Sequence, residues 1–321
     1  MNFEMNITWA LVALVAGLAI LWKSADVLVS GAVGLAKKFQ ISPLIIGLTV
    51  VAMGTSAPEV AASIAAALRN NPNIALGNVY GSNIANLALV GGLCAIISPI
   101  TIRVSMLKRE MPVMLGAGLL LLPMLNDSFL SRVESIILLC IFVGLIILTV
   151  YHARKKPEAF IAEIDRNSTK EKSKSLFVNF VFVAIGLAGL AFGAEITVRG
   201  AVVIGAKAGL SNAVIGLTIV AIGTSLPELV TCLVASFKGH DDISIGNIVG
   251  SNIFNTLMVT GLAGVVRPFV VVGQLKGLDY WVMISISAGF IFLGIIQKKI
   301  SRTGGVILLS FYIAYLGYLF I

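Results

Sequence analysis

Long apolar runs follow one another along the whole chain and are separated by short polar stretches. Several runs exceed the ~18 residues that a helix needs to cross a lipid bilayer. A transmembrane β-barrel is disfavoured, because its strands would alternate polar and apolar residues over about 10 positions. The pattern predicts an all-α integral membrane protein. Its ten helices are expected near 8–36, 41–69, 73–98, 107–126, 130–152, 176–206, 211–238, 242–266, 277–297 and 303–321.

Composition agrees with this interpretation and excludes other classes. The chain is 58% apolar and 12% charged, whereas soluble domains have about 25% charged residues. His152 and His240 are the only histidines, and both lie at predicted helix ends. With no nucleophile–base pair and no metal set visible, we expect neither an enzyme nor a cofactor. The net charge of +8 does not imply a nucleic-acid partner in such a protein, and no protein partner is evident.

Basic residues predict the orientation in the cell membrane. The polar stretch 152–175 is rich in lysine and arginine, and loops of this kind stay in the cytoplasm. Most other basic residues then fall on the same side. Both termini are expected outside, because five helices precede this stretch and five follow it.

The two halves of the chain are related in sequence. A shift of 169 residues aligns 42–99 with 211–268 without a gap, and 25 of the 58 pairs are identical. We therefore expect a first five-helix repeat at 1–151, a cytoplasmic linker at 152–175 and a second repeat at 176–321. Because five is odd, the second repeat must enter the membrane in the opposite direction, as in many transporters.

The first repeated phrase is GLTVVAMGTSAPE at 47–59 and GLTIVAIGTSLPE at 216–228. Pro58 and Pro227 each lack an amide proton and clash with the carbonyl four residues earlier, so each helix should kink or unwind. The kinks would free carbonyl oxygens near Ala52 to Thr55 and Ala221 to Thr224. Within a membrane, such groups persist only where neighbours, water or a bound ion satisfy them.

A glutamate ends each copy of this phrase. Glu59 and Glu228 lie inside apolar segments, where each costs roughly 2.5–3.5 kcal/mol and by default marks an ion or proton pathway. Hydroxyls stand beside both, and carbonyl, hydroxyl and carboxylate oxygens together suit hard cations such as Ca²⁺. The adjacent hydroxyls belong to Thr55, Ser56, Thr224 and Ser225. A structural role for a lone glutamate would require a nearby cation, and only Arg69 and Lys238, at helix ends, are close in sequence.

The second phrase is GNVYGSN at 77–83 and GNIVGSN at 246–252, each followed by a further asparagine. Its paired glycines lie four residues apart and allow another helix to approach closely. Ser82 with Asn86, and Ser251 with Asn255, share a helix face and are candidates to complete the site. Simple packing is the alternative for these small and polar residues. Four other asparagines are expected to bond the loosened backbone: Asn78, Asn83, Asn247 and Asn252.

These motifs resemble those of the cation/Ca²⁺ exchanger superfamily, and specifically its prokaryotic Na⁺/Ca²⁺ exchanger-like branch. GTSAPE, GNVYGSNIAN, GTSLPE and GNIVGSNIFN match the two α-repeats of that family. The resemblance implies ten transmembrane helices, with four central helices carrying the site. It also implies that the first and sixth helices form a long tilted pair that slides across them.

The resemblance also implies roles for individual residues. Glu59 and Glu228 would be carboxylates shared by Ca²⁺ and Na⁺. Thr55 and Thr224 would give backbone carbonyls to Ca²⁺ and help to hold Na⁺. Flanking Na⁺ sites would be completed by Ala52 with Ser82 and by Ala221 with Ser251. Asn86 and Asn255 would line the middle, although several relatives carry aspartate in place of Asn255.

Together these features predict an antiporter that exchanges Ca²⁺ leaving the cell for Na⁺ entering it. Ca²⁺/H⁺ exchange through the same glutamates is the alternative, although a proton would not need the hydroxyl and carbonyl positions. A channel is a third possibility, but no selectivity loop is visible. Asp26 and Glu195 occupy equivalent positions of the two repeats, and either a structural role or ion handling is compatible with them.

Overall fold

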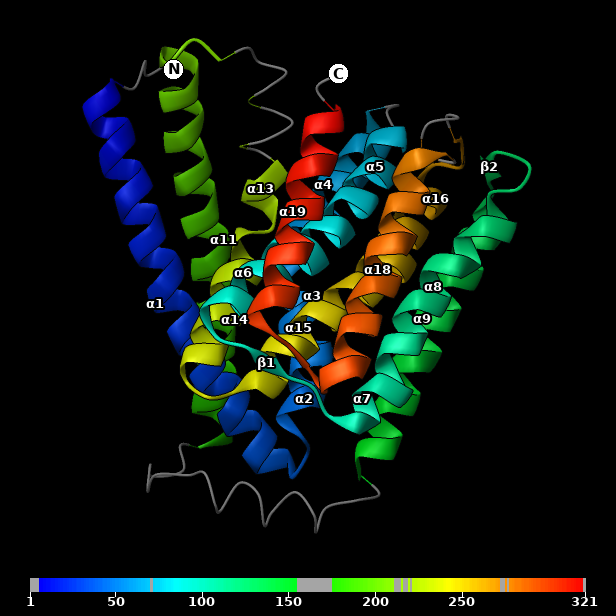
Figure 1. Ribbon diagram of the computed structural model, residues 1–321, viewed down its shortest axis with the longest axis horizontal. Helices are drawn as coiled ribbons and strands as arrows, with labels where there is room; N and C mark the ends of the chain where they lie inside the picture. Colours follow the sequence, from blue (N-terminus) through cyan, green and yellow to red (C-terminus); the bar gives the residue numbers. More distant parts are fainter. Residues whose placement is uncertain are drawn as a thin grey trace.

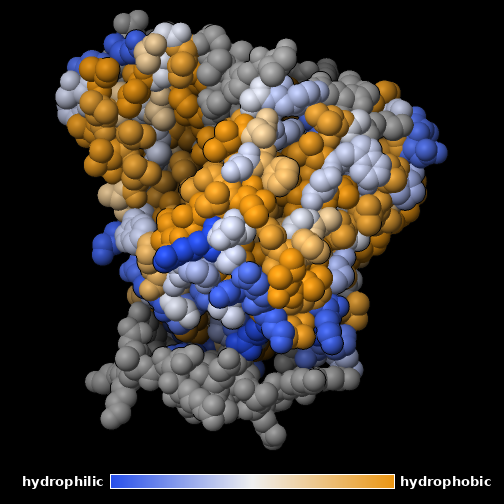
Figure 2. All heavy atoms as spheres, in the orientation of Figure 1, coloured by the Kyte–Doolittle hydropathy of each residue, from blue (hydrophilic) through white to orange (hydrophobic). Residues whose placement is uncertain are grey.

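The computed structural model describes residues 6–69, 72–154, 175–210, 215, 219, 221–271, 275 and 277–319. Helices dominate the described chain and run roughly parallel to one another (Figure 1). Seven are long and apolar enough to cross a membrane, or eight if a bent pair counts as one span. Figure 2 shows apolar side chains covering most of the visible face, with hydrophilic residues gathered towards its lower end. The expected all-α membrane protein is confirmed.

The first half begins with the long helix α1 (Ile7–Phe39), whose N-terminus is capped by the side chain of Asn6. The broken helix that follows comprises α2 (Pro43–Ile46), η1 (Gly47–Val51), α3 (Ala52–Thr55) and α4 (Ala57–Leu68). The next comprises α5 (Pro72–Ile84), η2 (Ala85–Val90) and α6 (Gly91–Ile97). Strand β1 (Ile100–Thr101), α7 (Val104–Lys108), α8 (Glu110–Met124), β2 (Phe129–Leu130) and α9 (Arg132–Arg154) complete this half.

The second half repeats the order. It contains α11 (Leu176–Lys207), α13 (Ala221–Thr224), α14 (Leu226–Phe237), α15 (Asp241–Phe254), η4 (Asn255–Val259) and α16 (Thr260–Val266). Strand β3 (Phe269–Val270), α18 (Leu278–Gln297), β4 (Lys299–Ile300) and α19 (Arg302–Leu319) follow. Most of the predicted helix at 211–238 before Ala221 lies outside the described residues. Elsewhere the predicted boundaries are close, but the short α7 is separate from α8, whereas we expected one continuous helix near 107–126.

Helices α1 and α11 pack side by side at one edge of the molecule (Figure 1). Adding or subtracting 169 residues at both members of a contact between these helices gives another contact between them. A Cβ atom added to Gly31 would lie 3.0 Å from the amide of Val183, and one added to Gly200 would lie 2.9 Å from the amide of Leu14. The second pair is the image of the first, because 31 corresponds to 200 and 14 to 183. Such reciprocal contacts are the mark of a two-fold relationship.

Two small antiparallel strand pairs, which no sequence pattern predicted, show the same exchange between the halves. Strand β1 pairs with β4, and β2 pairs with β3. By the same shift, β1 corresponds to β3, and β2 corresponds to β4 within one residue. Each pair therefore joins the two halves, and the labels β1 and β2 in Figure 1 lie towards opposite ends of the bundle.

Backbone conformation follows the repeat as well. Gln40 ends α1 with φ 54°, and its counterpart Gly209 has φ 84°. Ser128 (φ 63°) and Lys298 (φ 52°) precede β2 and β4. A non-glycine residue with positive φ is uncommon. One stands directly before β2 and another directly before β4, so the halves share local structure as well as sequence.

Candidate functional site

The first repeated phrase lies on broken helices in both halves. In the first copy Ser56 has φ −84° and ψ 9°, and the helix bends by 43° between Pro43–Thr55 and Ala57–Leu68. Ser225 has nearly the same conformation, φ −89° and ψ 3°, between α13 and α14. Each proline stands at the start of the helix after the break, where its missing amide proton costs least. The interruption predicted from the prolines is confirmed in both copies.

Several π-helical turns occur in the described parts of the broken helices and of the helices that follow them, and the sequence did not reveal them. Segment η1 precedes the first break, while η2 and η4 contain Asn86 and Asn255. A π turn widens the helix and alters the direction of its side chains, and such turns are frequent at functional sites. They lie within glycine- and alanine-rich stretches, which offer no distinct local signal for a π turn.

Both glutamates are completely buried. Glu59 lies in the first turn of α4 and Glu228 in the first turn of α14, and each is 0% exposed. The positive end of a helix dipole therefore faces each carboxylate. The Ser56 hydroxyl donates to Glu228 Oε1 at 2.9 Å, a contact that joins the two halves. Glu228 Oε2 and both oxygens of Glu59 have no hydrogen-bond partner.

Further buried polar atoms without partners belong to the predicted site. They are Ser225 Oγ, Ser251 Oγ and the side-chain oxygen and nitrogen atoms of Asn86 and Asn255. Segment η2, which carries Asn86, contacts α14, and η4, which carries Asn255, contacts α4. More than half of the unpartnered buried atoms in the described chain are therefore on these few residues and the two glutamates. Native proteins satisfy nearly all such groups, so their concentration here requires an explanation.

The remaining predicted residues are placed as follows. Ala52, Thr55, Ser56 and Ser82 are buried. The Thr55 hydroxyl lies 3.4 Å from the Ala52 carbonyl oxygen and donates at 3.1 Å to Asn247 Oδ1, which ties α3 to α15. Thr224 is half-buried at the end of α13, and Ala221 begins that helix. All twelve predicted positions therefore lie on the broken helices and on the helices that pack against them.

Asparagines outside this set mainly join helices. Asn78 donates to the Glu59 carbonyl oxygen at 3.4 Å and to Ser63 Oγ at 3.1 Å, and its counterpart Asn247 donates to Cys232 Sγ at 3.4 Å. Cys232 is the counterpart of Ser63, so the two contacts are equivalent. The expectation that asparagines bond the loosened carbonyls near Ala52 to Thr55 is not met by Asn78, because the Glu59 carbonyl lies within the regular helix α4. The expectation is also wrong for Asn83, which donates to Thr256 Oγ1 at 2.8 Å, and Asn252 bonds the carbonyl of Ile248 in its own helix.

The glycines of the second phrase behave differently in the two copies. A Cβ atom on Gly250 would lie 2.6 Å from the Leu48 carbonyl oxygen and 2.8 Å from Ala52 Cβ, so α15 and η1 touch backbone to backbone. For Gly77 the only neighbour in the described chain is a Leu275 methyl at 3.8 Å. The predicted close approach is thus confirmed for the second copy alone.

The charge around the glutamates is uncompensated by protein groups. The ion pairs of the described residues lie elsewhere, and these residues contain no cluster of three histidine, cysteine or acidic side chains suited to a metal. Asp26 forms an ion pair with Lys238, and Glu195 pairs with Arg199 at 2.6 Å. The site is therefore two carboxylates among hydroxyl, amide and carbonyl oxygens, an arrangement that suits a hard cation.

Comparison with protein families gives a match over most of the chain. The family described as sodium/calcium exchanger protein matches residues 9–151 and 178–321. The gap between the two matched segments contains the linker expected at 152–175.

Individual relatives are similar over almost their whole length. A putative antiporter, CaxA of Alkalimonas amylolytica, is 38% identical over 95% of this chain and 97% of its own. The sodium/calcium exchanger MaX1 of Methanosarcina acetivorans is 33% identical over 98% and 99%. A solved structure of the sodium-calcium exchanger NCX_Mj superposes with a TM-score of 0.81 at 31% identity and covers 96% of this chain and 97% of the other.

Proposed function

The chain belongs to the sodium/calcium exchanger family, and from this premise we propose that it moves Ca²⁺ out of the cell in exchange for Na⁺ moving in. The observation that carries the proposal is the pair Glu59 and Glu228. Both are completely buried, three of their four carboxylate oxygens lack a partner, and no basic side chain in the described part of the chain neutralises them. Buried charges occur where they are paired or hold a metal ion, since an uncompensated one is very costly. A transported cation is the natural counter-charge.

The proposed ligands combine charge with neutral oxygens. Glu59 and Glu228 together balance one Ca²⁺, with backbone carbonyls of Thr55 and Thr224 beside them. Na⁺ is proposed to use Ser82 with Ala52 and Ser251 with Ala221, with Ser56 and Ser225 as secondary contributors. Asn86 and Asn255 line the middle. Because Na⁺ and Ca²⁺ share the glutamates, their binding is competitive, and this competition couples the two fluxes.

Transport requires the buried site to open to each side in turn. With both glutamates fully buried, no ion can exchange with solvent until helices move. We propose ten transmembrane helices in two inverted repeats. The reciprocal α1–α11 contacts and the exchanged strand pairs support an approximate two-fold axis relating the halves. In this scheme α1 and α11 slide against the remaining helices, both termini lie outside, and the 152–175 linker lies in the cytoplasm.

Flux measurements in proteoliposomes test the function and the counter-ion together. Vesicles containing the purified protein are loaded in turn with Na⁺, with K⁺ or with acidic buffer, and uptake of radioactive Ca²⁺ is followed. Uptake driven by internal Na⁺ alone is expected. Uptake driven by the pH step alone would show that the counter-ion is H⁺ and not Na⁺. Uptake without any counter-ion would contradict antiport.

Variants of the two glutamates connect this flux to the site. Glu59→Gln and Glu228→Gln preserve side-chain shape but remove half of the negative charge, so each is expected to abolish exchange while eluting as a folded protein in detergent. Native flux in either variant would show that the site is wrongly placed. Loss of folded protein would indicate that these carboxylates are structural instead.

A further inference from the structure

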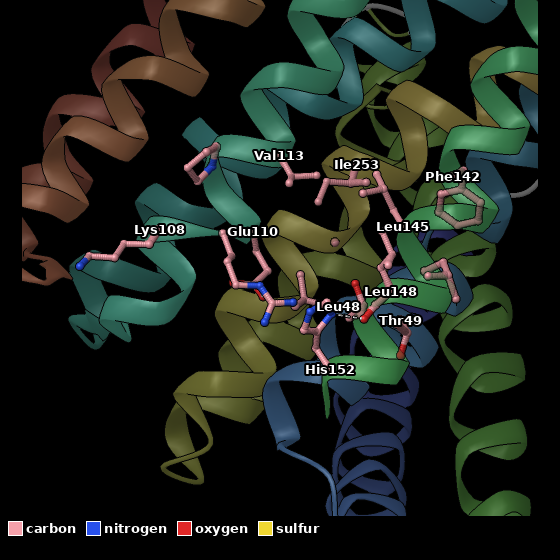
Figure 3. Close-up of a pocket in the computed structure, with 15 residues that line it drawn as sticks. Leu48, Thr49, Lys108, Glu110, Val113, Phe142, Leu145, Leu148, His152 and Ile253 are labelled. Atoms are coloured by element: carbon pink, nitrogen blue, oxygen red, sulfur yellow. Dashed lines mark hydrogen bonds and ion pairs between the residues drawn. The ribbon is translucent and has the colours of Figure 1, made fainter. Parts of the chain in front are cut away.

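A cavity of about 490 Å³ lies between α8, α9, η1 and α15, apart from the glutamates (Figure 3). Its inner wall includes Leu48 of η1 and Gly250 of α15, the two positions where those helices touch. Gly250 directly precedes the predicted ligand Ser251. An occupant of this cavity would therefore press on a contact one residue from the ion site.

The walls of the cavity divide into an apolar part and a polar part. The apolar part comes from Val113, Phe142, Leu145 and Ile253, which extend from three different helices towards the same space (Figure 3). The polar part consists of Lys108, Arg109, Glu110 and His152. It lies where α8 begins and α9 ends, the end at which the linker expected in the cytoplasm departs.

The charges of the polar part do not suit a passage for cations. Lys108 and Arg109 are both positive, and His152 Nδ1 is occupied by the Leu148 carbonyl at 2.8 Å. The only acidic group, Glu110, has its Oε1 atom 3.7 Å from Arg109 Nε. A positive rim repels Ca²⁺ and Na⁺ and attracts an anionic group such as a phosphate.

Glu110 places a second, independent requirement on the ligand of this cavity. Glu110 lines the cavity and its side chain is only 11% exposed, with an Oε2 atom that is buried without a hydrogen-bond partner. Leaving such an acceptor unsatisfied is unfavourable. A fitting ligand therefore brings a negative group for the cations, an N–H or O–H donor for Glu110, and an apolar part for the walls.

We propose that this cavity binds a membrane phospholipid. Its phosphate lies against Arg109, a donor of its headgroup meets Glu110 Oε2, and one acyl chain occupies the apolar part, while Lys108 extends away from the cavity at its mouth (Figure 3). Basic pockets between transmembrane helices on the cytoplasmic side recognise lipid headgroups in this way. Ethanolamine and glycerol headgroups carry the required donor, whereas choline carries none, so the site should prefer the first two. Binding of the lipid is independent of the proposed transport function. An influence of the bound lipid on Ca²⁺ flux, in contrast, rests on that function.

Native mass spectrometry of the purified protein tests the binding directly. The protein is titrated separately with phosphatidylethanolamine, phosphatidylglycerol and phosphatidylcholine. We expect one retained lipid in the first two cases, with at least fivefold weaker retention of phosphatidylcholine. Equal retention of all three, or none, would overturn the proposal.

Three variants assign the binding to this cavity. Arg109→Gln should lose retention of all lipids, and Glu110→Leu should abolish the preference over phosphatidylcholine. Arg302→Gln removes an exposed cation that does not line the cavity and should behave as the wild type. Glu110→Leu also removes the unsatisfied acceptor, so its lipid-free thermal stability should not fall, which separates loss of preference from misfolding. If Arg109→Gln retained lipid normally but lost Ca²⁺ uptake, the cavity would be part of the ion path and the proposal would be wrong.

Discussion

The hydroxyl of Ser56 donates to the carboxylate of Glu228 at 2.9 Å, whereas the equivalent groups Ser225 and Glu59 have no partner. Nearly identical residues of the two repeats therefore have different hydrogen-bond partners. The difference agrees with the proposed alternating access, in which each half would adopt in turn the conformation that the other half has.

Ser56→Ala tests this asymmetry. The variant removes the donor that orients Glu228, and hydrogen bonds to charged groups contribute about 1.5–3 kcal/mol. We expect Ca²⁺ binding at equilibrium to weaken roughly tenfold. Ser225→Ala is the matched control and should change the Ca²⁺ affinity less under the same conditions. Equal losses in both variants would show that the two halves contribute alike to ion binding.

Asn255→Asp tests the proposed middle position. The variant places a third carboxylate beside the proposed ligands Glu59 and Glu228. Mutual repulsion should make the site take up an additional proton or monovalent cation. We expect Ca²⁺ flux to become more dependent on pH or K⁺ than in the wild type.

Asn86→Asp, the equivalent change in the first repeat, should behave similarly. Unchanged pH and K⁺ dependence in both variants would remove Asn86 and Asn255 from the site. The proposal for the glutamates would survive that outcome.

Gly250→Ala probes the contact between α15 and η1. The added methyl would lie 2.6 Å from the Leu48 carbonyl oxygen, so the helices must separate or the variant must lose stability. Overpacking of this kind costs about 1–3 kcal/mol, and the thermal midpoint in detergent should fall by several degrees. Gly289→Ala, where a Cβ atom meets nothing within 4 Å in the described chain, should keep the native midpoint.

Lys238→Gln tests the ion pair between α1 and the end of α14. Lys238 also donates to Ser30 Oγ at 3.2 Å, so it fastens α1 to the central helices at this end. Without it, the distance between spin labels at Phe39 and Gly239 should spread over a wider range. Arg199→Gln breaks an ion pair within α11 instead and should leave the distribution unchanged. A native distribution in Lys238→Gln would show that the ion pair does not restrain α1.

Single cysteines test the inverted orientation. Asp127 and Lys298 are exposed residues beside β2 and β4, at corresponding places in the two repeats. In a cysteine-free background, an impermeant thiol reagent should label position 127 in intact cells and position 298 only after the cells are opened. Labelling of both positions in intact cells would contradict inverted repeats.

The sequence predicted the breaks at Ser56 and Ser225 because proline chemistry is local. The burial of Glu59 and Glu228 followed from their apolar surroundings. The π turns at Asn86 and Asn255 were not predictable, since they depend on how neighbouring helices pack and not on any residue within them. The contact from Ser56 to Glu228 spans 172 residues, and no local pattern encodes which of two equivalent serines makes it. The cavity between α8, α9, η1 and α15 was also not predictable, because its lining residues come from helices that are far apart in the sequence.

The strand pairs have a consequence for how the chain is divided. Each pair takes one strand from each half, and the α1–α11 contact likewise joins the halves. An isolated half would therefore carry two strands with exposed edges and one long helix without its partner. Two copies of one half, related by a two-fold axis, would supply equivalent contacts to each other. The two halves therefore share the bonding pattern of a homodimer, and neither half alone satisfies these strand edges and this helix face.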